Sequence, residues 1–231
     1  MTESNLLLTA GCSFTQQQGW ANMVQQQCGY RQLKNLAIGG SSNDTQINRV
    51  NDFVLSRHDP FDMIWQVTFL SRINLRLPID HPDVVNKRYM PKKDQGFTYA
   101  EASPVANLID GTRHVDVLYD EYVWRHRDLG FLDVNNELAR LLCAMLLAKK
   151  LASRFMVFFA ANDVDERQSS RVQEFFAREN ITSVPYKDNL LDWTQSRNLP
   201  LAADGFHPAQ SSYESYAAEV IIPAFLSVDK A

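Results

Sequence analysis

The sequence predicts an α/β fold built around a parallel sheet. Short apolar runs such as residues 6–10 do not alternate with polar residues, which is typical of strands that are buried on both faces. Longer stretches with apolar residues at helical spacing lie between these runs. The chain has 231 residues, 45% of them hydrophobic, which is enough for one domain with a sizeable core.

The first part of the chain follows a regular order of strands and helices. Gly11 ends the first apolar run, and Gly39 and Gly40 end the second. Ser41, Ser42 and Asn43 offer side chains that can cap the helix after them. We expect a strand at residues 6–10, a helix at 20–28, a strand at 33–38, a helix from these caps to about residue 57, and a strand at 63–69.

Residues 74–133 interrupt this order with several prolines and mixed charges. We interpret the segment as an insertion after the third strand, and as a candidate lid or substrate-pocket element. The regular order then returns. We expect a helix at 136–152, a strand at 155–160, a helix at 168–180, a short strand at 181–186, a helical turn at 190–195, and a last helix from Pro208 that Pro223 interrupts or ends.

Strands joined by helices imply right-handed crossovers and a parallel sheet. We therefore expect one domain over residues 1–231, a three-layer α/β/α sandwich with a flavodoxin-like, doubly wound five-stranded parallel sheet. In such sheets the ligand crevice lies at the carboxyl ends of the strands. That edge is where functional side chains are expected.

Charge and composition exclude several classes of partner. The net charge of −4 gives no broad basic field, so we expect no nucleic-acid partner and no anionic membrane surface. No apolar run approaches the roughly 20 residues of a membrane span. The three cysteines form no paired spacing, which indicates a reducing compartment, and we expect a cytoplasmic protein that acts on a small molecule.

No metal site is expected from the histidines. His58, His81, His114 and His126 lack the spacing of zinc ligands. Cys12 follows the first strand and is expected to point into the core rather than to react. The sequence therefore implies neither a metal nor another cofactor.

Ser13 and His207 are the candidate catalytic residues. A serine hydroxyl is a weak nucleophile until a base takes its proton, and a third group must orient that base. Asp204 precedes His207 by three residues in a glycine-containing loop, so its carboxylate can reach the imidazole Nδ1. The Ser13 amide and Gly40 follow strands, where backbone N–H groups can stabilise a developing oxyanion.

These segments resemble the blocks of the SGNH/GDSL hydrolases. Gly-Cys-Ser-Phe-Thr at 11–15 resembles the first block, Asn-Leu-Ala-Ile-Gly-Gly at 35–40 the second, and Asp-Gly-Phe-His-Pro at 204–208 the last. The resemblance implies Ser13 as nucleophile, Gly40 as an oxyanion-hole glycine, His207 as base and Asp204 as its orienting partner.

The third block of that family, Gly-x-Asn-Asp, has no counterpart here. Ser71 falls roughly where its asparagine would stand, at the end of the third strand. Three side chains are candidates for the missing oxyanion donor: Ser71, Thr68 and Asn162.

The resemblance implies an esterase with a Ser-His-Asp triad that acts on an acyl ester, such as an O-acetylated carbohydrate or a small metabolite. Two alternatives stay open. One is an O-acyltransferase that uses a sugar hydroxyl as acceptor. The other is a non-catalytic ligand-binding module that retains the fold.

Overall fold

The computed structural model of the chain describes residues 4–16, 19–39, 41–56, 59–68, 73–78, 92–94, 97–102, 134–161 and 166–228. Its main sheet has five parallel strands in the order β2-β1-β3-β7-β8. The strands are β1 (Leu6–Ala10), β2 (Gln32–Asn35), β3 (Asp62–Val67), β7 (Arg154–Phe159) and β8 (Thr182–Ser183). Counted along this sheet alone, the order is 2-1-3-4-5, so the predicted flavodoxin-like α/β fold is confirmed.

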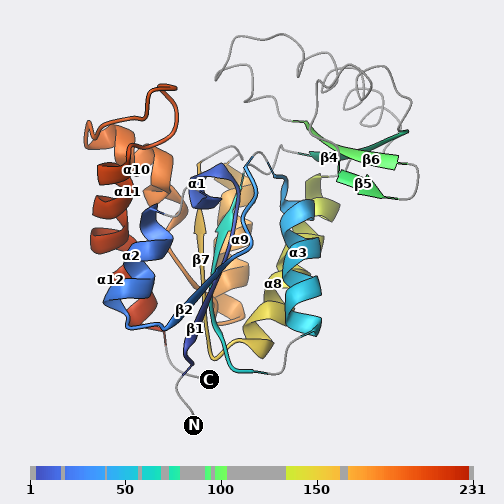
Figure 1. Cartoon of the computed structure of the whole chain (residues 1–231), viewed down its shortest axis with the longest axis horizontal. Helices are drawn as coiled ribbons and strands as arrows, with labels where there is room; N and C mark the ends of the chain where they lie inside the picture. The colour runs from blue at the N-terminus through green and yellow to red at the C-terminus, as the bar shows by residue number, and fades with distance from the viewer. Residues whose placement is uncertain are drawn as a thin grey trace.

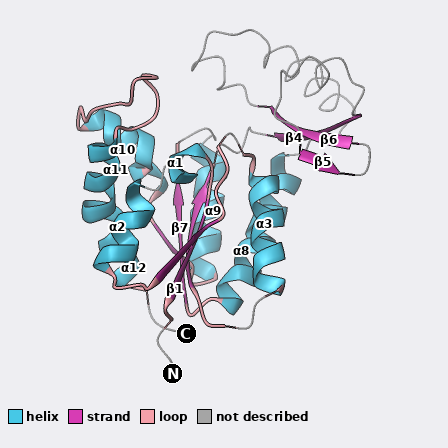
Figure 2. Ribbon diagram, viewed as in Figure 1, coloured by secondary structure: helices cyan, strands magenta, loops and turns pink. Residues whose placement is uncertain are grey.

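Helices cover both faces of this sheet (Figure 1). One face packs against α3 (Asn43–Leu55), α8 (Val134–Leu151) and α9 (Glu166–Arg178). The opposite face packs against α2 (Gly19–Gln27), α10 (Leu190–Ser196), α11 (Gln210–Tyr216) and α12 (Ile222–Leu226). Figure 2 shows the sheet between these two helical layers. The short helix α1 (Ser13–Gln16) directly follows β1, and the 3-10 turn η2 (Tyr186–Asp188) follows β8.

The central strands are buried on both faces, and most of their residues are apolar. Every residue of β1 and β3 is buried. Leu8 and Met63, which are paired in register, face α3 and α8, whereas Leu7 and Ile64 face α2 and the C-terminal helices. Fully burying one such side chain contributes about 1.5–3 kcal/mol. The hydrophobic stabilisation of the fold is therefore centred on these strands.

Two strands are shorter than the sequence predicts. Regular pairing in β2 stops at Asn35, whose side-chain Oδ1 accepts a hydrogen bond from the Ala37 amide (2.9 Å). The amides of Leu36 and Ile38 still donate to the carbonyls of Thr9 and Gly11, so the chain continues beside β1 past the end of the strand. β8 holds only Thr182 and Ser183, and Pro185 lies just before η2. A proline cannot donate to a strand ladder, so the predicted strand to residue 186 ends early.

The C-terminal helix continues past Pro223 through a change of hydrogen-bond register. A π-helical segment, η3 (Ala217–Ile221), joins α11 to α12, and Pro223 lies in the first turn of α12. Proline has no N–H to donate to the preceding turn. The regular α-helix is therefore interrupted just before Pro223, at this π-helical segment, as the sequence predicts.

A second, three-stranded antiparallel sheet belongs to the predicted insertion. It has the order β4-β6-β5 and consists of β4 (Ile73–Pro78), β5 (Lys92–Asp94) and β6 (Phe97–Ala102). β4 contacts α3, and Figure 1 shows this small sheet near the amino-terminal end of α3, on the side where the strands of the main sheet end. Residues 103–133 of the insertion lie outside the described residues.

A buried ion pair lies at the amino end of the main sheet. The Arg154 Nε donates to Asp62 Oδ2 (2.8 Å), and the Tyr30 hydroxyl donates to the same carboxylate oxygen. Arg154 Nη2 also contacts the Tyr30 hydroxyl (2.6 Å). Burial, together with the bond to Asp62, raises the pKa of Tyr30 well above its usual value. The Tyr30 hydroxyl therefore keeps its proton and its bond to Asp62.

Replacing Asp62 with alanine is expected to lower the free energy of unfolding by about 3–5 kcal/mol, because the buried Arg154 charge loses its partner. Urea unfolding would measure this change. Glu219→Ala is the matched control, since its pair with Arg197 is about half exposed and should contribute less than about 1 kcal/mol. Equal effects of the two variants would contradict the structural role of Asp62.

Candidate active site

Ser13 lies at the carboxyl end of β1, as the sequence predicts. The strand ends at Ala10, and Ser13 is the first residue of α1. The backbone amides of Thr15 and Gln16 both donate to the Cys12 carbonyl (3.0 and 2.9 Å), which closes the turn. Cys12 itself is fully buried in the core, as expected. The turn therefore presents the Ser13 side chain at the edge of the sheet.

Gly11 permits the close packing beneath this turn. A Cβ atom at Gly11 would lie 2.3 Å from Thr15 Oγ1 and 2.6 Å from Gln66 Oε1, distances that real structures do not tolerate. Both of these atoms belong to buried side chains. The close packing beneath the turn therefore requires glycine at position 11.

Gly11→Ala is expected to destabilise the fold by about 1–3 kcal/mol and to slow any reaction of Ser13, because the added methyl displaces the turn. The measurements are urea unfolding and ester hydrolysis. Gly29→Ala is the control: Gly29 has φ +75, so alanine is strained there, yet it lies before β2 at the far end of the sheet. A Gly11→Ala protein with unchanged activity would contradict this packing argument.

Asp204 and His207 lie in the loop before α11. Their loop is closed by a bridge between Leu201 and Pro208, with Ala202 N donating to the His207 carbonyl (2.7 Å). Gly205 has φ +69, in the left-handed region that glycine adopts readily. This tight loop folds the Asp204 carboxylate back onto His207.

A continuous hydrogen-bonded chain joins Asp204, His207 and Ser13. His207 Nδ1 lies 2.6 Å from Asp204 Oδ2, and His207 Nε2 lies 2.7 Å from Ser13 Oγ. Because an ionised carboxylate can only accept, Nδ1 carries the proton and Nε2 is left to accept from the serine hydroxyl. Residues that are 194 positions apart in sequence therefore meet at one edge of the sheet.

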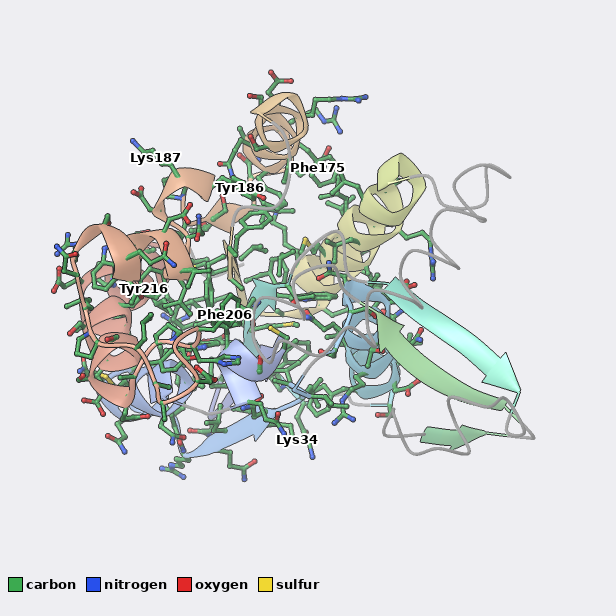
Figure 3. The ribbon with its side chains drawn as sticks, turned by 90° about the horizontal axis from the view of Figure 1, so that it is seen from above. Lys34, Phe175, Tyr186, Lys187, Phe206 and Tyr216 are labelled. Carbon is green, nitrogen blue, oxygen red and sulfur yellow. The ribbon has the colours of Figure 1, made fainter. Side chains whose placement is uncertain are left out.

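The imidazole packs against two phenyl rings that also contact each other. The His207 ring centroid lies 4.8 Å from that of Phe14 and 5.4 Å from that of Phe206. Figure 3, which looks down on the carboxyl ends of the strands, places Phe206 beside α1. His207 is only 9% exposed, so its ring orientation is fixed by packing as well as by Asp204.

Backbone hydrogen bonds keep Asp204 ionised. The Phe206 amide donates to Asp204 Oδ1 (2.9 Å), and His207 donates to the carboxylate from both its amide and its ring. These bonds lower the pKa of Asp204 to about 2, with the Phe206 amide as the largest cause, although partial burial opposes the shift. A charged Asp204 is therefore available to orient His207 at any moderately acidic or neutral pH.

This lowered pKa predicts a pH dependence of stability. Because the pKa is lower in the folded chain than in the unfolded chain, Asp204 contributes stability above pH 3.8 that is lost as the pH falls towards about 2. Asp204→Asn should remove this contribution, so wild type and variant should converge in unfolding free energy over that interval. Urea unfolding at several pH values would test this, and a constant difference would contradict it.

The second predicted segment lies against the first. The Asn35 side-chain amide donates to the Thr15 carbonyl (2.9 Å), and the Ser41 hydroxyl donates to the Gly11 carbonyl (3.1 Å). A Cβ atom at Gly39 would lie 3.9 Å from Ser13 Cβ. The backbone just before Gly40 therefore runs close to Ser13. Sequence reasoning had not assigned these contacts to Asn35 and Ser41.

Only some of the predicted oxyanion donors lie within the described residues. Among the residues that the structure describes, none accepts a hydrogen bond from the Ser13 amide. Thr68 is buried at the end of β3, where its amide donates to Asn43 Oδ1 (3.1 Å) and its carbonyl accepts from Asn43 Nδ2 (3.4 Å). Gly40, Ser71 and Asn162 lie outside the described residues, so their roles stay predictions.

Within the described ranges, no group of three or more histidine, cysteine or acidic side chains is arranged to hold a metal ion. The four other histidines lie outside these ranges. None of the helices described has the length and apolar character needed to cross a membrane.

Comparison with known proteins shows a similar fold in two solved structures. No protein-family model and no curated protein sequence matches this chain. The structure of TesA is similar with a TM-score of 0.51 at 13% identity, covering 95% of this chain and 97% of that one. A catalytic mutant of Axe2, an acetylxylan esterase from Geobacillus stearothermophilus, has a TM-score of 0.52 at 14% identity, covering 98% and 94%.

Proposed function

We propose that this chain is a serine ester hydrolase of the SGNH/GDSL type. The observation that carries the proposal is the chain of short contacts from Asp204 Oδ2 through the His207 ring to Ser13 Oγ. The contacts lie at the carboxyl edge of a doubly wound sheet, where ligands bind in such folds. The fold shared with TesA and with the acetylxylan esterase Axe2 supports the same assignment.

In the first half of the reaction, Ser13 Oγ forms a bond to the carbonyl carbon of the ester. Its proton passes to His207 Nε2, which lies 2.7 Å away, and the carbonyl electron pair moves onto oxygen. When the tetrahedral intermediate collapses, the bond to the alkoxy oxygen breaks. The departing alcohol takes the proton from His207, and the acyl group stays on Ser13.

In the second half, water attacks the acyl carbon and gives its proton to His207. Collapse then breaks the bond to Ser13 Oγ, which recovers that proton, and a carboxylic acid is released. Asp204 remains a carboxylate throughout, because its pKa of about 2 lies far below neutral pH. Its role is to hold the imidazole in one tautomer and to stabilise the imidazolium that forms twice.

The proposed oxyanion hole combines backbone and side-chain donors. The Ser13 amide has no acceptor within the described residues, and Gly40 follows a glycine that lies close to Ser13. We assign the third donor to Ser71, with the Thr68 hydroxyl or Asn162 as substitutes. Losing one such donor typically slows the reaction by about 10²–10³-fold.

The proposed substrate is an acyl ester of a small molecule or carbohydrate. O-acetylated carbohydrates are the first class to test, since a structure of similar fold belongs to an acetylxylan esterase. The insertion at 74–133 begins where β3 ends, at the same edge of the sheet as Ser13. We propose that the insertion forms part of the substrate site within a single domain.

Hydrolysis can be measured on p-nitrophenyl acetate and on acetylated xylo-oligosaccharides, each with and without a free sugar as acceptor. Release of acetate as the main product supports the hydrolase. Two results would overturn it: a dominant transfer product in the presence of the acceptor indicates an acyltransferase, and saturable binding without turnover by folded protein indicates a binding module.

A further inference from the structure

We propose that Gln66 is a positioning residue that fixes the turn carrying Ser13, a role that rests on the proposed function of Ser13. Gln66 acts through Cys12 and Thr15, which lie on either side of the serine. For residues 11–16 we use the name nucleophile turn.

Gln66 occupies a position that should hold an apolar side chain. It lies in the central strand β3, on the same face as Ile64, and pairs in register with Phe158 of β7. Its side chain has no exposed surface. Burying an amide costs free energy unless its polar atoms are hydrogen-bonded, so the role of this residue has to be sought in its partners.

Those partners are concentrated in the nucleophile turn. Gln66 Oε1 accepts from the Cys12 amide (3.1 Å) and from the Thr15 hydroxyl (3.0 Å), and the Cys12 thiol lies 3.4 Å away. Gln66 Nε2 donates to the Val67 carbonyl (2.6 Å). The opposite amide orientation would place an NH₂ group against the Cys12 N–H, so the oxygen must face the turn.

These bonds fix the nucleophile turn to β3. Cys12 is fixed through its amide by Gln66 and through its carbonyl by the amides of Thr15 and Gln16. Ser13 lies between the two residues that Gln66 binds, and its hydroxyl must stay within hydrogen-bond distance of His207 Nε2. Because a misplacement of about 1 Å at a reacting group can cost 10²-fold in rate, losing this anchor should slow the chemical step.

Gln46 provides a matched control in the same protein. It is also a buried glutamine, and its Oε1 accepts from the indole Nε1 of Trp65 (2.7 Å). Trp65 belongs to the core on the opposite face of the sheet from the Gln66 side chain. Replacing either glutamine with leucine leaves a buried donor unpaired, but only Gln66→Leu releases the nucleophile turn.

The test compares Gln66→Leu and Gln46→Leu in unfolding free energy and in hydrolysis of p-nitrophenyl acetate. We expect both variants to be destabilised, whereas Gln66→Leu alone lowers kcat, by about 10–100-fold with KM changed less than about threefold. Thr15→Val, which loses the hydroxyl bonded to Gln66, should lower kcat in the same direction, and Thr15→Ser should retain it. Equal kcat values for wild type, Gln66→Leu and Thr15→Val would overturn the proposal.

Nitrogen NMR of the His207 ring separates this inference from the proposed function. If wild type hydrolyses no ester, the hydrolase assignment fails and the ring signal decides the role of Gln66. A shift of the Nε2 resonance in Gln66→Leu, absent in Gln46→Leu, shows that Gln66 sets the Ser13–His207 contact. An unchanged resonance would overturn that role. If Gln66→Leu fails to fold, the Nε2 resonance of His207 is measured in Thr15→Val instead and is interpreted in the same way.

Discussion

Replacing Ser13 with alanine is expected to lower kcat for ester hydrolysis by about 10⁴-fold or more, because no other group can take over its bond to the acyl carbon. The Ser13 hydroxyl is the group that lies 2.7 Å from His207 Nε2. The side chain is only partly buried, so the fold should persist. A loss of this size with retained structure would place the reaction at Ser13.

Hydrolysis of p-nitrophenyl acetate and urea unfolding, measured on the same samples, would check this prediction. Ser196→Ala is the control variant, because its hydroxyl bonds the Trp193 carbonyl (3.1 Å) at the end of α10, away from Ser13 and His207. That variant should keep the wild-type rate. Folded Ser13→Ala protein that still turns over ester at a rate near wild type would contradict Ser13 as nucleophile.

His207→Ala should cause a loss of similar size, about 10⁴-fold, because the serine hydroxyl then has no base to take its proton. The two residues act as one unit through their 2.7 Å contact, so their effects should not add. The double variant Ser13→Ala/His207→Ala is therefore expected to be no slower than Ser13→Ala alone. Losses that multiply in the double variant would contradict His207 as the base.

The fold could be predicted from the sequence because its signals are local. β1 and β3 read as mostly apolar runs without alternation, and the helices between the strands show helical spacing. Strand ends were predicted less well. Regular pairing in β2 ends at Asn35, although the Leu36 and Ile38 amides still donate to the carbonyls of Thr9 and Gly11.

The three candidate catalytic side chains could also be found in the sequence. Asp204 and His207 are three residues apart in a glycine-containing loop, and Ser13 follows the first strand, so the fold itself predicts their meeting at the carboxyl edge. The packing around these three side chains could not be predicted in the same way. The contacts of Phe14 and Phe206 with the His207 ring depend on how distant elements dock, which no spacing encodes.

Gln66 shows why a supporting residue is harder to find. A single glutamine in the run Met-Ile-Trp-Gln-Val leaves the strand prediction unchanged and has no motif. The role of Gln66 becomes visible only in the structure. There β3 pairs with β1 as far as Ala10 and Trp65, and Gln66 directly follows this last pair. The signal that remains in the sequence is the polar residue itself, between the apolar residues Trp65 and Val67 of a buried strand.

Labelling with a fluorophosphonate, followed by mass spectrometry of the modified peptide, tests most directly whether His207 activates Ser13. We expect one adduct on Ser13, absent in Ser13→Ala and strongly slowed in His207→Ala, since the reagent reacts with serines that a neighbouring base has activated. Folded wild-type protein that forms no adduct, or that is modified at another serine, would contradict this expectation.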